Sequence, residues 1–164
     1  IPVINRGFGG STMAETRDAL RRIVIPLNPK AVIVYAGSHD LHGPKGKTPE
    51  QVAEEFAELC RELRAAQPDV RIGFISCKPS LAKWENIDRD RRLNTLIQNF
   101  VAHEPAVFYI DLWSALAPPE GQLPDPRWFQ ADRNHLSPDA YQELAILVRR
   151  ALMSEGIAAE VPDR

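Results

Sequence analysis

The sequence has few cysteines, no long apolar run and no strong excess of one charge. Cys60 and Cys77 stand in no metal-binding or redox spacing, so two buried thiols are the simpler interpretation. The longest apolar runs, such as 31–37, have the length of a strand and are far too short to cross a bilayer. With 20 basic and 22 acidic residues the net charge is −2, which gives no general attraction to nucleic acid or to an anionic membrane. We therefore expect no membrane span and no nucleic-acid partner.

The composition suits one folded domain with a hydrophobic core. Hydrophobic residues make up 44% of the 164 residues and charged residues 26%, which is typical of a globular chain. Short apolar runs alternate with amphipathic helix patterns, as expected for βαβ units and a parallel sheet. We expect a single α/β domain over residues 1–164, with 157–164 as a frayed tail. Strands are predicted at 2–5, 31–36, 70–77 and 107–110.

Residues that cap helices mark the starts of four predicted helices. In two of them a threonine is followed three residues later by Glu or Gln, which is the pattern of a capping box. A loop is predicted after Gly37 as far as Lys47, and the proline-rich stretch 113–134 is predicted to be another. The predicted helices begin near Thr12, Thr48, Asp88 and Ser137.

Three polar clusters follow predicted strands or lie on the same side of the sheet. They cover residues 5–12, 37–42 and 132–135. In an open parallel sheet, ligands bind beyond the carboxyl ends of the strands. The convergence of three such segments at one edge predicts a functional site there.

The last cluster contains Asp132 and, three residues later, His135. A carboxylate at this spacing can accept a hydrogen bond from the imidazole. That contact fixes the tautomer of the ring and stabilises the imidazolium formed when the ring takes up a proton. The same spacing also suits a capping loop whose polar groups only satisfy the backbone, so the pattern leaves both interpretations open.

The other two clusters could stabilise negative charge. Gly9 and Gly10 precede a helix N-terminus, where free backbone N–H groups and the helix dipole favour an anion. In the 37–42 segment, a side chain could donate a hydrogen bond to a developing oxyanion. A metal site is the alternative, although the spacing matches no strong template. Its ligands would be His39, Asp40, His42 and His135.

Taken together, the clusters resemble consecutive sequence blocks of the SGNH hydrolases, which are also called GDSL-like hydrolases. Residues 5–12 (Asn-Arg-Gly-Phe-Gly-Gly-Ser-Thr) resemble the second block. Residues 35–40 resemble the third block, Gly-x-Asn-Asp, and residues 132–136 resemble the fifth, Asp-x-x-His. Residues 75–80 (Ile-Ser-Cys-Lys-Pro-Ser), with Trp84, are similar to a bacterial esterase subgroup of the same superfamily.

The resemblance implies a three-layer α/β/α fold with a parallel, flavodoxin-like sheet. It also implies a serine esterase or acylhydrolase that cleaves a small ester without a metal or an organic cofactor. In that mechanism His135 takes the proton of the attacking serine, and Asp132 orients His135. Gly10 and His39 would form the oxyanion hole. The candidates for the substrate side of the site are Asn5, Ser38 and Trp84.

Two features depart from the family pattern. His39 stands where the family has the asparagine of its oxyanion hole. A neutral histidine donates one N–H, at a different distance from the backbone than an amide N–H. His39 could therefore be a working substitute, a sign of altered specificity or a cause of weakened activity. The Gly-Asp-Ser block that carries the nucleophile is absent, and none of the serines present lies in such a motif.

The absent block also affects the expected sheet. The resemblance implies strand order 2-1-3-4-5, with the missing strand between the strands at 2–5 and 31–36. We therefore expect residues 1–164 not to be a self-sufficient fold, because two strand edges would stay unpaired. The nucleophile is expected upstream of residue 1 or from another chain, unless the sheet closes up. The alternative is a catalytically inactive binding or structural domain, and an exported or an intracellular protein would fit equally well.

Overall fold

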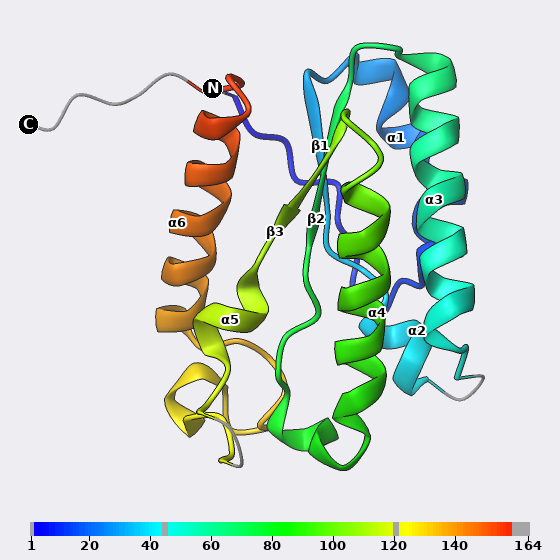
Figure 1. Cartoon of the computed structure of the whole chain (residues 1–164). Helices are drawn as coiled ribbons and strands as arrows, with labels where there is room; N and C mark the ends of the chain where they lie inside the picture. Colours follow the sequence, from blue (N-terminus) through cyan, green and yellow to red (C-terminus); the bar gives the residue numbers. More distant parts are fainter. Residues whose placement is uncertain (1, 44–45, 120–121, 159–164) are drawn as a thin grey trace, which may run out of the picture.

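The computed structural model describes residues 2–43, 46–119 and 122–158, and its centre is a parallel sheet (Figure 1). Strand β2 (Arg71–Ile75) lies in the middle, paired with β1 (Ala31–Val34) on one side and β3 (Val107–Ile110) on the other. The strand order is thus β1-β2-β3. The predicted parallel sheet is confirmed, although each of its three strands in these ranges is four or five residues long.

Helices α1 (Met13–Ile23), α3 (Pro49–Ala66) and α4 (Ile87–Val101) cover one face of the sheet. Their apolar side chains pack with those of the strands into the larger core. Phe56 of α3 and Phe74 of β2 are fully buried there, with ring centroids 4.9 Å apart in an edge-to-face arrangement. Burial of such rings is a main source of stability in a domain of this size.

A second, smaller core lies on the opposite face, under α5 (Leu112–Leu116) and α6 (Pro138–Ser154). Side chains alternate between the two faces along each strand, so Phe74 belongs to the first core and its neighbour Ile75 to the second. Helices on both faces of one parallel sheet make three layers, as the sequence predicted. Short helical segments complete the chain: η1 (Ile25–Leu27), α2 (Ser38–His42), η2 (Leu81–Asn86) and η3 (Pro126–Trp128).

The predicted helix starts and cysteine positions agree with the structure. Capping boxes begin α1 at Thr12 and α3 at Thr48, and the Ser137 hydroxyl caps α6. Cys60 and Cys77 are both buried as free thiols. No helix in the described ranges is both long and apolar enough to cross a membrane.

Three local predictions were wrong. Residues 2–5 form no strand, and Val3 and Ile4 are 86% and 57% exposed, because no strand lies beside them to supply hydrogen bonds and cover. The 37–42 segment, expected to be a loop, forms the short helix α2. The predicted loop 113–134 contains most of α5 and all of η3.

The C-terminal segment is described only in part. Ile157 packs against the second core, and its N–H bonds to the carbonyl of Leu152 at 2.9 Å. Residues 159–164 of the predicted tail lie outside the described residues.

Candidate active site

Asp132 and His135 lie in the loop between η3 and α6, and their side chains are hydrogen-bonded to each other. The bond joins Nδ1 of His135 to Oδ2 of Asp132. The other carboxylate oxygen, Oδ1, accepts the backbone N–H groups of Asn134 and His135, each at 2.9 Å. The bond from the His135 ring, followed by these two amides, lowers the pKa of Asp132 to about 2. The carboxylate is therefore ionised at neutral pH and holds the ring by Nδ1.

The Asp132–His135 pair is open to solvent in this chain. The side chain of His135 is 69% exposed and that of Asp132 is 46% exposed. The loop itself is fixed, because the N–H of Gln130 bonds to the carbonyl of His135 at 2.8 Å and an isolated bridge joins Phe129 to Leu136. A preformed carboxylate–imidazole pair is thus exposed in this loop.

Helix α2 places Ser38 and His39 directly after the carboxyl end of β1. The turn into the helix requires glycine at position 37, because its φ is 112° and an added Cβ would lie 3.0 Å from the Leu93 side chain. The Ser38 hydroxyl accepts a hydrogen bond from Nζ of Lys83 at 3.3 Å. His39 is exposed.

Glu15 lies in the first turn of α1, where it completes the capping box with Thr12. Hydrogen bonds from the backbone and side chain of Thr12 lower the pKa of Glu15, and the charge of His39 adds to this effect.

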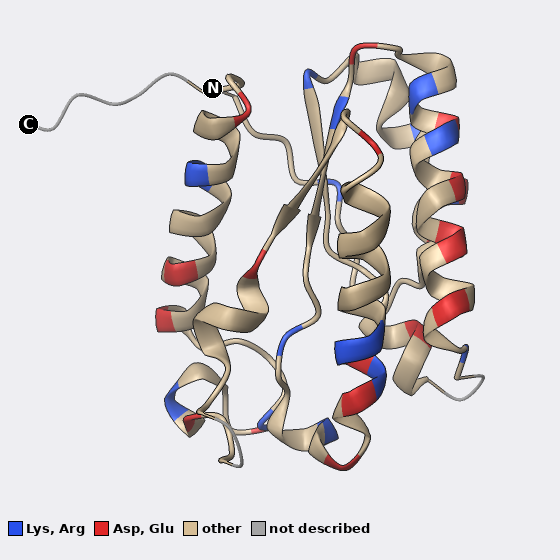
Figure 2. Cartoon of the chain, viewed as in Figure 1, with Lys and Arg blue, Asp and Glu red and all other residues tan. Residues whose placement is uncertain are grey.

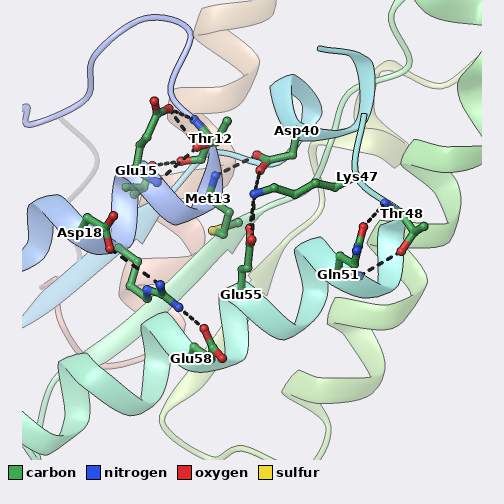
Figure 3. Close-up of polar contacts among 12 residues, drawn as sticks. Thr12, Met13, Glu15, Asp18, Asp40, Lys47, Thr48, Gln51, Glu55 and Glu58 are labelled. Atoms are coloured by element: carbon green, nitrogen blue, oxygen red, sulfur yellow. Dashed lines mark hydrogen bonds and ion pairs between the residues drawn. The ribbon is translucent and has the colours of Figure 1, made fainter. Parts of the chain in front are cut away.

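Asp40 is a buried residue whose contacts the sequence did not reveal. Its side chain is fully buried, and Oδ2 accepts the backbone N–H of Met13 at 2.8 Å (Figure 3). Oδ1 bonds to Nζ of Lys47 at 2.9 Å, and the same ammonium bonds to Glu55 at 2.8 Å. Asp40 thus fastens α2, which carries His39, to the first residue of α1, which follows the Gly10 turn.

Gly10 and Asn5 belong to an exposed turn before α1. Gly10 has a φ of 73° and no atom within 4 Å of an added Cβ, so its backbone is accessible. The side chain of Asn5 accepts the N–H of Gly7 at 2.9 Å, which stabilises the turn locally. Within the described ranges, no hydrogen bond joins either residue to the Asp132–His135 pair.

The segment after β2 connects the 37–42 segment to the 132–135 loop. Ser80 donates to the side-chain oxygen of Asn134 at 2.9 Å, and the N–H of Ala82 bonds to the carbonyl of Arg133 at 3.1 Å. Trp84 follows, with the guanidinium of Arg91 5.6 Å from its ring centroid. The structure therefore brings Ser38 and the segment that ends at Trp84 to the same edge as the 132–135 loop.

The residues of the metal alternative do not converge. Asp40 is engaged by Met13 and Lys47, and Nε2 of His42 lies 2.5 Å from a buried Asp90 oxygen. His135 is paired with Asp132. The part of the chain that the structure describes contains no group of three or more His, Cys, Asp or Glu residues able to hold a metal ion.

A parallel sheet between two helical layers, with polar loops at its carboxyl edge, defines an α/β/α domain of the SGNH hydrolase type. The chain belongs to the GDSL-like Lipase/Acylhydrolase family, whose model matches residues 1–143. A comparison with curated proteins found no match.

Solved structures with the same fold come from several organisms. A protein from Bacteroides fragilis assigned as an acylhydrolase has a TM-score of 0.82 and 18% identity, over 93% of this chain and 74% of that one. A GDSL-like lipase from Bacteroides thetaiotaomicron has a TM-score of 0.78 and 20% identity, over 93% and 76%. A carbohydrate esterase of family 3 from Talaromyces cellulolyticus has a TM-score of 0.73 and 17% identity, over 91% and 70%. At such identities the likeness establishes the fold.

Proposed function

We propose that this chain forms most of a serine esterase or acylhydrolase that cleaves a small ester. His135 is the general base, Asp132 orients and stabilises it, and the nucleophilic serine comes from a segment outside residues 1–164. The observation that carries the proposal is the hydrogen bond between His135 Nδ1 and the Asp132 carboxylate. It leaves Nε2 for a proton transfer, as a triad histidine requires.

The unpaired edge of β1 supports the proposal that a segment outside residues 1–164 adds a strand to the sheet. Within the described ranges β1 bonds only to β2, so its other edge presents free N–H and C=O groups. Unpaired edges of this kind favour pairing with a further strand. A strand added there in parallel would end near Gly37, next to His39. A serine at that end would face the exposed Asp132–His135 pair.

The proposed reaction runs through an acyl-enzyme. Nε2 of His135 takes the proton of the serine hydroxyl while the serine oxygen attacks the ester carbonyl. The backbone N–H of Gly10 and the imidazole of His39 donate to the oxyanion of the tetrahedral intermediate. The C–O bond of the ester then breaks, and His135 returns the proton to the departing alcohol. Water releases the acyl group by the same steps, and Asp132 stays ionised throughout because its pKa is about 2.

A serine-directed fluorophosphonate probe, applied to the natural full-length protein, tests this function. We expect the intact mass of that protein to exceed 18.4 kDa by at least the mass of a βα unit, roughly 30 residues. We expect covalent labelling of one serine, reduced at least about a thousandfold in rate by His135→Ala. His103→Ala is the matched control, because His103 bonds to the carbonyl of Asn99 on α4 and should leave labelling unchanged. A mass of 18.4 kDa with no labelled serine would refute independent catalysis.

A non-catalytic binding or structural domain is the second candidate. It is favoured by the histidine at position 39 and by the absence of a Gly-Asp-Ser motif. A folded full-length protein that no fluorophosphonate labels and that hydrolyses no ester would support this second candidate.

A further inference from the structure

Two lysines on the segment after β2 lie at the same edge as the candidate active site. Figure 2 shows basic residues along this stretch, at the carboxyl end of the sheet. Lys83 reaches α2, where its ammonium donates to the Ser38 hydroxyl at 3.3 Å. Lys78 precedes Pro79 and Ser80, and the Ser80 hydroxyl bonds to Asn134, next to His135, at 2.9 Å. The two lysines thus belong to the segment that contacts both Ser38 and the 132–135 loop.

Neither lysine has an acidic partner among the residues that the structure describes. No carboxylate oxygen in those ranges lies within 4.0 Å of Nζ of Lys78 or Lys83, although both side chains are partly buried. Lys47 shows the usual arrangement, since it is bonded to both Asp40 and Glu55. Pairing with an anion reduces the desolvation cost of a partly buried ammonium.

The electrostatics of the two lysines also favour a bound anion. Burial lowers the pKa of Lys78, and the positive charge of Lys83 lowers it further. Asp90 and Asp132 act in the opposite direction, but Asp90 is already paired with Nε2 of His42. Both oxygens of Asp132 also accept hydrogen bonds, one from the His135 ring and one from two backbone amides. An anion held between the lysines would remove the repulsion between them.

The backbone that carries Lys78 is held on both sides. Asn94 bonds to Cys77 twice, accepting its N–H at 2.8 Å and donating to its carbonyl at 3.1 Å. On the other side Pro79 and Ser80 are buried. The stem of Lys78 therefore leaves a fixed point of the fold, which lowers the entropy cost of binding a ligand.

We propose that Lys78 and Lys83 form a subsite for an anionic oxygen group of the substrate, a carboxylate or a phosphate or sulfate ester, beside the Asp132–His135 pair. The assignment of that anion to an ester substrate rests on the proposed function, whereas the binding of the anion itself does not. The preferred substrate is accordingly an ester whose acyl or alcohol part carries a negative charge.

Anion binding is measured without turnover, by amide chemical shifts of the full-length protein during titration with acetate, inorganic phosphate or sulfate. We expect saturable shifts at Lys78 and Lys83 with at least one anion, and none with acetamide, the neutral isostere of acetate. Affinity should fall at least about tenfold in Lys78→Met and Lys83→Met, and Lys78→Arg should retain it. Lys30→Met, at the opposite end of β1, is the control that should bind normally. Shifts that never saturate, or that persist in both methionine variants, would overturn the subsite.

Turnover is measured with a matched pair of esters, 2-acetoxyacetate and 2-acetoxyacetamide. We expect kcat/KM to favour the anionic ester by about tenfold or more, chiefly through KM. This ratio should fall toward one in the double variant K78M/K83M and stay unchanged in K30M. Equal rates for both esters would overturn the subsite while the esterase function stands. Saturable anion binding without hydrolysis of either ester would refute the esterase and leave the subsite standing.

Discussion

Asp40 accepts a hydrogen bond at 2.8 Å from the backbone N–H of Met13, 27 positions earlier in the sequence. The contact ties α2 to the first turn of α1. Helix α2 carries His39, and α1 follows Gly10. These two residues are the proposed oxyanion donors. The carboxylate is neutralised by Lys47, which Glu55 also holds (Figure 3). The position of Gly10 relative to His39 thus depends on the buried side chain of Asp40.

Replacing Asp40 by alanine should lower the free energy of unfolding by about 2–4 kcal/mol. The variant leaves the Met13 N–H without its acceptor and removes one of the two acidic partners of Lys47. Urea denaturation measures the change. Asp18→Asn is the control, because Asp18 is 74% exposed and 3.8 Å from Arg17, and it should cost less than about 0.5 kcal/mol. Equal effects of the two variants would show that the buried contact contributes nothing special.

The contact between His135 and Asp132 should be visible in the titration of the carboxylate. We expect carboxyl carbon shifts to report a pKa of about 2 for Asp132. His135→Ala should raise that pKa toward its ordinary value near 3.8, with the two backbone hydrogen bonds keeping it somewhat lower. Because the folded-state pKa is depressed, the stabilising effect of the contact is present above about pH 4 and is lost as the pH falls through about 2. An unchanged pKa in the alanine variant would mean that the amides alone hold the charge.

Local sequence patterns predicted the elements of this fold, but not the contacts between distant segments. The capping boxes at Thr12 and Thr48 depend on residues three positions apart, so the sequence displays them directly. Asp132 and His135 are equally local. The bonds of Asp40 to Met13 and of Lys83 to Ser38 span 27 and 45 positions, and no periodicity encodes them.

Two of the three misassigned segments have separate physical causes. Helix α2 has only five residues, too few for an apolar stripe to appear in the sequence. The segment 2–5 has the apolar composition of a strand, but it has no neighbouring strand to pair with in the described ranges. Strand formation depends on a partner as well as on composition, and the sequence of one strand cannot supply that partner.

If His39 serves as the second oxyanion donor, its removal should slow the reaction without affecting the fold. We expect His39→Ala to reduce kcat about a hundredfold in the full-length protein, the usual effect of losing one donor. His39→Asn, which restores the side chain typical of the family, should retain activity within about tenfold of the natural protein. His103→Ala, just beyond the C-terminal end of α4, should be unchanged. Full activity of the alanine variant would mean that His39 is not an oxyanion donor.

A side chain at Gly73, in the middle of β2, should lower the stability of the fold, because two large side chains from the neighbouring strands meet over this position. An added Cβ would lie 2.6 Å from the Phe108 ring and 2.7 Å from the Ile33 side chain, which is closer than real contacts allow. Both neighbours would have to move within the second core, which α6 covers. Overpacking of this kind typically costs about 1–3 kcal/mol, so Gly73→Ala should lower the urea midpoint accordingly. Gly9→Ala is the control, because no atom lies within 4 Å of its added Cβ, and an effect there as large as at Gly73 would exclude crowding as the cause.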